Sequence, residues 1–175
     1  QGWDSIIDGG TTGHAISMTG DDCTVHDITV QTTGGATNSY DGIFLNGATN
    51  CRIRDVQVLD SDRHGINAIG GANGLMVRDC YITSADNDAM YIDVRCRVSG
   101  MYIYSVGGYG IYMAGTSDNS ILETNYINTT GNDGIYIHTN SANNIISSNR
   151  IRGWTGEAID DDSGTATITG NNTGV

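Results

Sequence analysis

Short aliphatic runs alternate with polar, glycine-rich turns along the chain, and the whole pattern repeats. A Gly-Ile dipeptide, or its variants Ala-Ile and Ala-Met, recurs every 21 to 27 residues. Repeats of this length with strand-like composition are typical of solenoids, whose units stack on one another and cannot fold singly. The dipeptides begin at Ala15, Gly42, Gly65, Ala89, Gly110, Gly134 and Ala158.

Three columns of aliphatic residues appear when the repeats are aligned. Side chains alternate between the two faces of a strand, so the residues of each column point the same way, into the coil. The first column is Ile16, Ile43, Ile66, Met90, Ile111, Ile135 and Ile159. The second is Val25, Ile53, Val77, Val98, Leu122, Ile146 and Ile168, and the third is Val30, Val58, Ile82, Ile103, Ile127 and Ile151. We therefore predict an all-β parallel solenoid of about seven coils with three parallel sheets.

The chain is predicted to form a single domain over residues 1–175. Residues 1–13 are interpreted as a partial first coil, and residues 31–40 as an inserted loop that projects from the stack. Such loops often carry function, and a merely tolerated insertion is the alternative. The chain starts at Gln1 and has no signal peptide, as expected of a mature product or an excised domain.

A further inward column changes from apolar residues to asparagine. It lies two residues before the third aliphatic column and ends in Asn125, Asn149 and Asn171. Inward asparagine amides can bond the coils above and below, which satisfies polar groups that would otherwise be buried without partners. We expect an internal asparagine stack with a structural role.

The acidic composition limits the classes of partner. The chain has 20 acidic and 8 basic residues and a net charge of −12, whereas nucleic acid and anionic membrane both require a basic surface. No apolar run is long enough for a membrane helix. Strong negative charge also keeps a protein soluble in extracellular or salty surroundings. We therefore expect no nucleic acid partner and no membrane insertion.

Tyrosines occupy outward positions of two predicted sheets in three successive coils. They are Tyr91, Tyr112 and Tyr136 on the first sheet and Tyr81, Tyr102 and Tyr126 on the third. Neighbouring strands lie about 5 Å apart, so each set forms a ladder of rings. A ladder of this kind is either cross-strand packing or a strip for sugar rings or a partner protein, because tyrosine combines an apolar face with a polar tip.

Titratable residues line the edge just before each Gly-Ile dipeptide. The column is His14, Asp41, His64, Asp88, Tyr109, Asp133 and Glu157. Asp41 and Asp88 are two coils apart, with His64 between them, so their backbones are expected about 10 Å apart. Carboxyl groups at that separation are within reach of the arrangement used by inverting glycosidases. These three residues are therefore candidate catalytic residues, and ordinary turn chemistry of Asp before Gly is the alternative.

The last acidic cluster interrupts the inward pattern. Asp161 stands where Ile137 stands one coil earlier, between Asp160 and Asp162. An unpaired carboxylate cannot sit in an apolar core. Either the solenoid ends here, or the cluster binds a hard cation such as Ca²⁺.

The four cysteines are expected to point into the coils as small apolar residues. Cys23 and Cys51 stack about 5 Å apart by strand spacing. A disulfide between them is allowed but not favoured. No metal site is expected, because neither a Cys-x-x-Cys motif nor clustered histidines accompany them.

The repeat between Asp133 and Ile151 reads Asp-Gly-Ile-x-Ile, then Asn-x-Ile-x-x-Asn-x-Ile. It resembles the right-handed parallel β-helix repeat of pectin-degrading enzymes, alginate epimerases and lyases, copper-maturation periplasmic proteins and viral tailspikes. The resemblance covers nearly the whole chain. It implies the fold and its hand, but no single function, because sites are grafted on such scaffolds.

One segment resembles polygalacturonases more closely. Arg63-His64-Gly65-Ile66 is similar to their Gly-His-Gly-Ile segment, and Asp86-Asn87-Asp88 resembles their acidic pair. In that family the acidic pair precedes the histidine segment, whereas here it follows, and their Arg-Ile-Lys segment has no counterpart.

Three functions remain open from the sequence. We favour an extracellular, cell-surface or virion-surface module that presents a carbohydrate- or partner-binding face to a polysaccharide or surface glycan. The second is a glycoside hydrolase or lyase that works along the edge formed by Asp41, His64 and Asp88. The third is a structural subunit that stacks end to end, because open terminal coils recruit further strands. No cofactor is expected.

Overall fold

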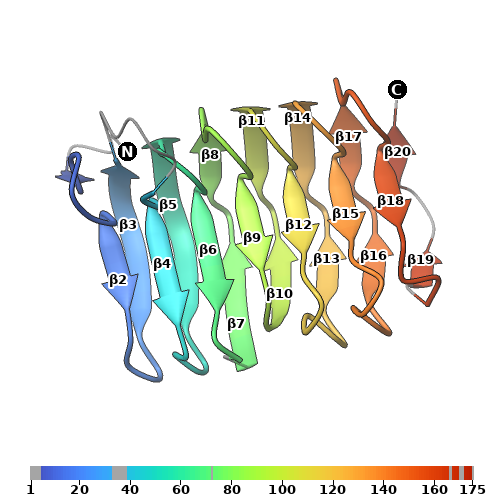
Figure 1. Ribbon diagram of the computed structural model, residues 1–175, viewed down its shortest axis with the longest axis horizontal. Coiled ribbons are helices and arrows are strands. Elements are labelled where there is room, and N and C mark those ends of the chain that lie inside the picture. The colour runs from blue at the N-terminus through green and yellow to red at the C-terminus, as the bar shows by residue number, and fades with distance from the viewer. Residues whose placement is uncertain (1–4, 33–38, 72, 166, 170–171, 175) are drawn as a thin grey trace.

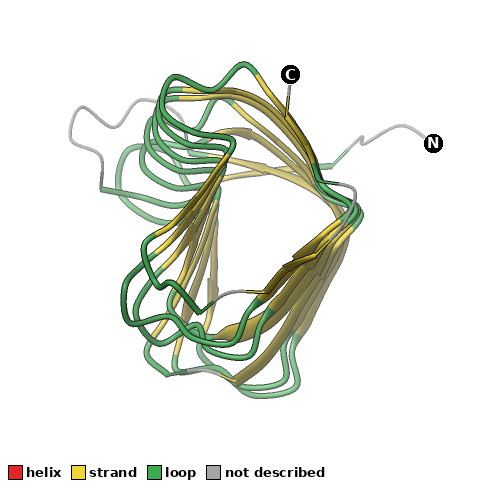
Figure 2. Ribbon diagram, turned by 90° about the vertical axis from the view of Figure 1, so that its right-hand side faces the viewer, coloured by secondary structure: helices red, strands yellow, loops and turns green. Residues whose placement is uncertain are grey.

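The strands pair in parallel, each with the equivalent strand of the next coil, in a computed structural model that describes residues 5–32, 39–71, 73–165, 167–169 and 172–174. The chain winds through about six turns, one fewer than the repeat predicts. Figure 1 shows the coils side by side from β2 to β18, and Figure 2 shows the closed cross-section seen along the stack. Neighbouring coils therefore bring together residues about 24 positions apart in the sequence.

One sheet contains the strand of each Gly-Ile repeat. Its seven strands are β2 (Ile16–Met18), β4 (Ile43–Asn46), β6 (Ile66–Ile69), β9 (Met90–Ile92), β12 (Ile111–Met113), β15 (Ile135–Ile137) and β18 (Ile159–Asp161). In each strand from β4 to β15, the first and third residues are buried in the core. This alternation is the pattern that the sequence predicts.

The other sheet has 13 strands, arranged as two limbs that share their first members. The shared strands are β3 (Thr24–Gln31) and β5 (Arg52–Asp60), and β1 (Ile6–Asp8) pairs with the end of β3 that follows the corner between the limbs. The first limb contains β7 (Asn73–Arg78), β10 (Arg95–Ser99), β13 (Ile121–Glu123), β16 (Ile145–Ser147) and β19 (Thr167–Thr169). The second limb contains β8 (Tyr81–Thr83), β11 (Tyr102–Val106), β14 (Tyr126–Thr130), β17 (Arg150–Arg152) and β20 (Thr173–Gly174).

The prediction of three sheets is wrong, and a corner one residue long explains why. At the turn between the limbs, one residue per coil adopts a left-handed backbone with φ between 52° and 66°: Asp27, Asp55, Asp79, Gly100, Thr124 and Ser148. β3 and β5 pass this corner unbroken, so β5 pairs with β7 on one limb and with β8 on the other. Short polar side chains tolerate this backbone, but neither strand pattern nor composition shows whether pairing continues through it.

The core contains the three aliphatic columns, fully buried wherever a coil lies above and below. The asparagine stack is confirmed at Asn125 and Asn149, both of which are completely or almost completely buried. The next member is Asn172, whose Oδ1 accepts hydrogen bonds from the backbone N and Nδ2 of Asn149 at 2.9 and 3.1 Å. Asn171, which the sequence alignment selects, lies outside the described residues. A one-residue shift in the last repeat accounts for the change.

Most of the inserted loop predicted at residues 31–40 lies outside the described residues. Gln31 ends strand β3, Ser39 and Tyr40 lead into the next coil, and residues 33–38 are not described. At the first rung, β1 pairs with β3. Within the described residues no helix is long and apolar enough to cross a membrane.

Candidate functional site

The register places the first tyrosine ladder as the sequence predicts. Tyr91, Tyr112 and Tyr136 pair across β9, β12 and β15, and each is half-buried. Their ring centroids are 5.0 Å apart at both steps, with interplanar angles of 6° and 32°. The edge column extends this strip, because Tyr109 lies 5.2 Å from Tyr112 and from Tyr136, and His64 lies 5.2 Å from Tyr91.

The second tyrosine ladder lies on the second limb of the larger sheet. Tyr81, Tyr102 and Tyr126 stack at centroid distances of 5.1 and 4.9 Å. The guanidinium of Arg150 covers the next face, 5.6 Å from the ring centroid of Tyr126. This cation–π contact closes one end of the ladder, and Gln57 is the register neighbour of Tyr81 at the other end.

Stacking decides what the first ladder presents to solvent. Because its rings lie against one another, they expose edges and hydroxyl groups more than open faces. Burial raises the pKa of Tyr91, Tyr109 and Tyr112 above the ordinary value. All three phenols are therefore protonated at neutral pH and can donate hydrogen bonds to a ligand.

The edge column forms a ladder of hydrogen bonds between coils. His14 Nδ1 accepts the backbone N–H of Asp41 at 2.9 Å, and Asp41 Oδ1 accepts that of His64 at 3.2 Å. Further along, Asp88 Oδ1 accepts the backbone N–H of Tyr109 at 2.9 Å. Each of these side chains binds the backbone of the next coil, which gives the column a structural purpose in addition to any chemistry.

Asp41 is held more firmly than any other residue of the column. Its carboxylate is completely buried and accepts a forked pair of bonds from Arg63 Nε and Nη2, at 2.8 and 2.5 Å. Asn67 Nδ2 donates to Oδ2 at 3.0 Å. Donors occupy both oxygens of this carboxylate, which fixes its position. Asp41 therefore positions Arg63 and Asn67 and is poorly placed to exchange a proton with a substrate.

His64 and Asp88 form a second, looser couple. His64 Nδ1 lies 3.2 Å from Asp88 Oδ2, but without the alignment of a hydrogen bond, and both side chains are buried. Unpaired polar atoms concentrate around this couple. Of the four such buried side-chain atoms among the described residues, three belong to Ser61, His64 and Asn67. Buried polar groups are normally satisfied, so this coil is where the hydrogen bonding of the fold is least complete.

Asn67 interrupts the aromatic column between Phe44 and Tyr91. The register stacks these three residues on β4, β6 and β9, and the Asn67 side chain is turned inward toward Asp41. Phe44 is covered on one side by His14, whose ring is stacked at 4.4 Å. A rung without an outward ring therefore separates two aromatic residues. We call this position, which lies between Phe44 and Tyr91, the Asn67 rung.

Sequence reasoning found part of this site and missed part. Asp41, His64, Asp88 and the ladder of Tyr91, Tyr112 and Tyr136 do share one face and its edge. The ladder of Tyr81, Tyr102 and Tyr126 lies on a different sheet and does not join them. The role of Asn67 was missed, although its signal was present as the single amide among outward aromatic residues.

Hydrogen bonds organise the terminal acidic cluster. Tyr136 Oη donates to Asp162 Oδ2 at 2.8 Å, and Asp161 Oδ1 accepts the backbone N–H of Ser163 at 3.1 Å. Asp161 occupies the inward register position opposite Ile137 but is only half-buried, because β18 is the last strand of its sheet. In the described parts of the chain, no group of three or more His, Cys, Asp or Glu side chains could hold a metal ion.

The four cysteines are free thiols. Cys51, Cys80 and Cys96 are buried as predicted, whereas Cys23 is half-buried at the first coil. Burial raises the pKa of Cys80 and of Cys96 to about 12. These two thiols are therefore packing residues and not nucleophiles at neutral pH.

Comparison with known proteins agrees with this architecture. Residues 14–173 match the family described as right handed beta helix region. No curated protein and no solved structure was found to match. The match spans nearly the full chain and includes every coil that carries the tyrosine ladders and the edge column, and it confirms the hand that the repeat implies. The chain belongs to the right-handed β-helix family.

Proposed function

We propose that this β-helix domain binds a glycan along the outer face of its seven-stranded sheet, outside the cell or on a virion surface. The observation that carries the proposal is the continuous strip formed by Tyr91, Tyr112 and Tyr136 beside the polar edge column. Tyr109 and His64 extend the strip at ring distances of 5.2 Å. A sugar chain needs such a mixture of apolar contact and hydrogen-bonding groups along one line.

The Asn67 rung is the position along this face where a sugar ring would meet no outward aromatic side chain. Elsewhere the rings of the ladder cover one another, so a ligand meets edges and hydroxyl groups. At this rung, Asn67 stands between Phe44 and Tyr91 and is itself almost completely buried. Arg63 lies at the same level, held by Asp41, with its side chain about a third exposed. Its remaining N–H groups can bind hydroxyl or carboxylate groups of the glycan.

A glycan array that compares matched tyrosine variants tests this proposal. Tyr112→Ala removes the central ring and is expected to weaken binding of the best array ligand about two- to tenfold, since one ring contact contributes roughly 0.5–1.5 kcal/mol. Tyr112→Phe keeps the stack and removes only the hydroxyl, so it separates loss of a hydrogen bond from loss of packing. Tyr104→Ala is the control, because this exposed tyrosine lies on the other sheet. Equal affinity of the parent and Tyr112→Ala would refute the proposal.

The enzyme alternative is supported by a single observation, the proximity of His64 and Asp88. A couple of this kind can exchange a proton with a substrate, as acid–base catalysis requires. The same array ligand should then release reducing sugar with the parent and none with Asp88→Asn. The amide of that variant can still accept the Tyr109 N–H, so its fold should survive. Binding without sugar release assigns the face to recognition alone.

A further inference from the structure

Most of the basic residues of this acidic chain are gathered on one surface. All eight are arginines. Five of them point outward from the three neighbouring strands β5, β7 and β10: Arg52, Arg54, Arg78, Arg95 and Arg97. We call this surface the arginine face. It lies on the first limb of the larger sheet, away from the seven-stranded sheet that carries the tyrosine strip and the edge column.

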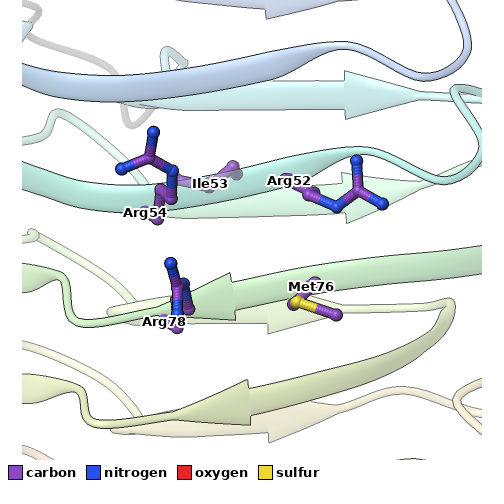
Figure 3. A pocket seen from close by; sticks show the side chains of 5 residues that line it. All are labelled: Arg52, Ile53, Arg54, Met76 and Arg78. Carbon is purple, nitrogen blue, oxygen red and sulfur yellow. The ribbon is translucent and has the colours of Figure 1, made fainter.

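Strand register sets like charges beside each other on the arginine face. Arg54 pairs directly with Arg78, and Met76 lies between Arg52 and Arg97. Figure 3 shows Arg54 beside Arg78 and Arg52 beside Met76 on neighbouring strands. Like charges directly opposite each other on adjacent strands destabilise a sheet. The isolated chain therefore bears an electrostatic cost here that an acidic partner would relieve.

Carboxylates of the chain itself compensate this face only in part. Arg54 lies 2.9 Å from Asp55, and Arg97 lies 2.5 Å from Glu123. Arg52, Arg78 and Arg95 have no carboxylate within 4.0 Å among the described residues. Three of the five guanidinium groups thus keep their full capacity for ion pairs.

The shape and composition of the face fit a protein partner. Two shallow pockets of about 170 and 230 Å³ lie on either side of Met76, whose side chain is exposed. Ile121 follows in the same register column, and the exposed Ile145 comes one coil later. Arginine and methionine are enriched and lysine is depleted in protein interfaces, and this face has an apolar centre with an arginine rim.

An acidic surface lies in the same coils as Arg54 and Arg78 of the arginine face. A hollow of about 450 Å³ is lined at its mouth by Asp60, at the end of β5, and by Asp86, in the next coil. Both carboxylates are exposed, and neither has a basic partner within 4.0 Å among the described residues. Burial and the neighbouring charges of Asp86 and Asp62 raise the pKa of Asp60. The hollow is therefore crowded with negative charge that the chain itself does not neutralise.

We propose that the arginine face binds the Asp60–Asp86 hollow of a second copy of this chain, with the two solenoids side by side and their axes parallel. The charges are complementary, and both patches span the same two coils. Arg54 and Arg78 pair on adjacent strands, and Asp60 and Asp86 lie in the same two adjacent coils.

Such a contact joins two different patches, so it is heterologous. Each copy retains a free arginine face or a free hollow until a ring closes, which allows assemblies larger than a dimer. Because Arg54 and Asp60 lie on the same strand, copies associate laterally, in contrast to the end-to-end stacking expected from open terminal coils. The tyrosine strip takes no part in the contact, and the proposal stands apart from glycan binding.

Sedimentation velocity of the purified chain and four variants tests the contact. In about 0.1 M salt the Debye length is near 10 Å, and in 1 M salt it is near 3 Å. The parent should associate in the first buffer, in proportion to its concentration, and dissociate in the second. Arg78→Glu and Asp86→Arg should each weaken association at least tenfold, since each places like charges together. Arg150→Glu is the matched control, an exposed strand arginine outside the face, and should associate like the parent.

The charge-swapped double variant makes the test specific. Arg78→Glu combined with Asp86→Arg restores opposite charges across the contact and should recover association. A parent that stays monomeric in both buffers overturns the proposal, as does equal association of the parent and Arg78→Glu. A monomeric parent that instead binds polyglutamate through Arg78 would assign the face to an acidic peptide. Melting temperatures close to that of the parent show that each variant is folded.

Discussion

Replacement of Asn149 by Leu is the sharpest test of the internal polar stack. Asn149 is completely buried and makes four hydrogen bonds through its side chain. Its Nδ2 donates to the carbonyl of Leu122 at 3.0 Å and to Asn172 at 3.1 Å. Its Oδ1 accepts both the backbone N–H and the Nδ2 of Asn125 at 3.0 Å. Leucine fills the position but offers none of these bonds.

The loss of stability in Asn149→Leu follows from the polar groups that the substitution leaves without partners. The Asn125 backbone N–H and one Nδ2 hydrogen of Asn125 lose their acceptor, whereas Asn172 Oδ1 keeps the Asn149 backbone N–H. Each orphaned buried group costs about 1–3 kcal/mol. Two orphaned donors therefore lower the free energy of unfolding by about 2–6 kcal/mol. With a urea slope of roughly 2 kcal/mol/M, even the lower value moves the midpoint by about 1 M.

Equilibrium urea unfolding, followed by far-ultraviolet circular dichroism, measures this effect. Asn128→Leu is the matched control, because Asn128 lies on β14 outside the asparagine stack and is only half-buried. It should change stability by no more than about 0.5 kcal/mol. The reasoning is refuted if Asn149→Leu matches the parent. The double variant with Asn125→Leu should cost less than the sum of the two single variants, because both remove the same bond.

Two further predictions concern the edge of the seven-stranded sheet. Gly110→Ala places a Cβ 2.4 Å from the carbonyl oxygen of Gly134 and should lower the free energy of unfolding by about 1–3 kcal/mol. Gly13→Ala is the control, because a Cβ at Gly13 meets open space. Equal stability of the two variants in urea would contradict this prediction. Burial lowers the pKa of His14 below 6.5, so the unfolded chain binds the proton more readily and the parent should lose stability as the pH falls below about 6.5. Protonation of His14 also removes the acceptor for the Asp41 N–H. The loss of stability between about pH 7 and pH 5 should therefore be smaller in His14→Gln than in the parent. Parallel curves of stability against pH for the two proteins would count against this account.

The repeat in the sequence determined the coil and most of its register. Side-chain direction in a strand depends only on local backbone alternation, and stacking then multiplies one local pattern along the chain. For this reason the aliphatic columns, both tyrosine ladders and the pairing of Asn125 with Asn149 could be read directly from spacing. The same logic placed Asp41, His64 and Asp88 along one edge.

Tertiary structure alone decided what happens between coils and at corners. Whether Asp27 and Asp55 end a strand or carry it around a corner depends on pairing with the next coil, so the number of sheets could not be derived. The burial of Asp41 depends on Arg63 folding back across one coil, which spacing does not show. The arginine face arises because outward positions of β5, β7 and β10 come into register despite unequal coil lengths. A net charge of −12 hides it, because the sum over a chain does not record where on the surface each charge lies.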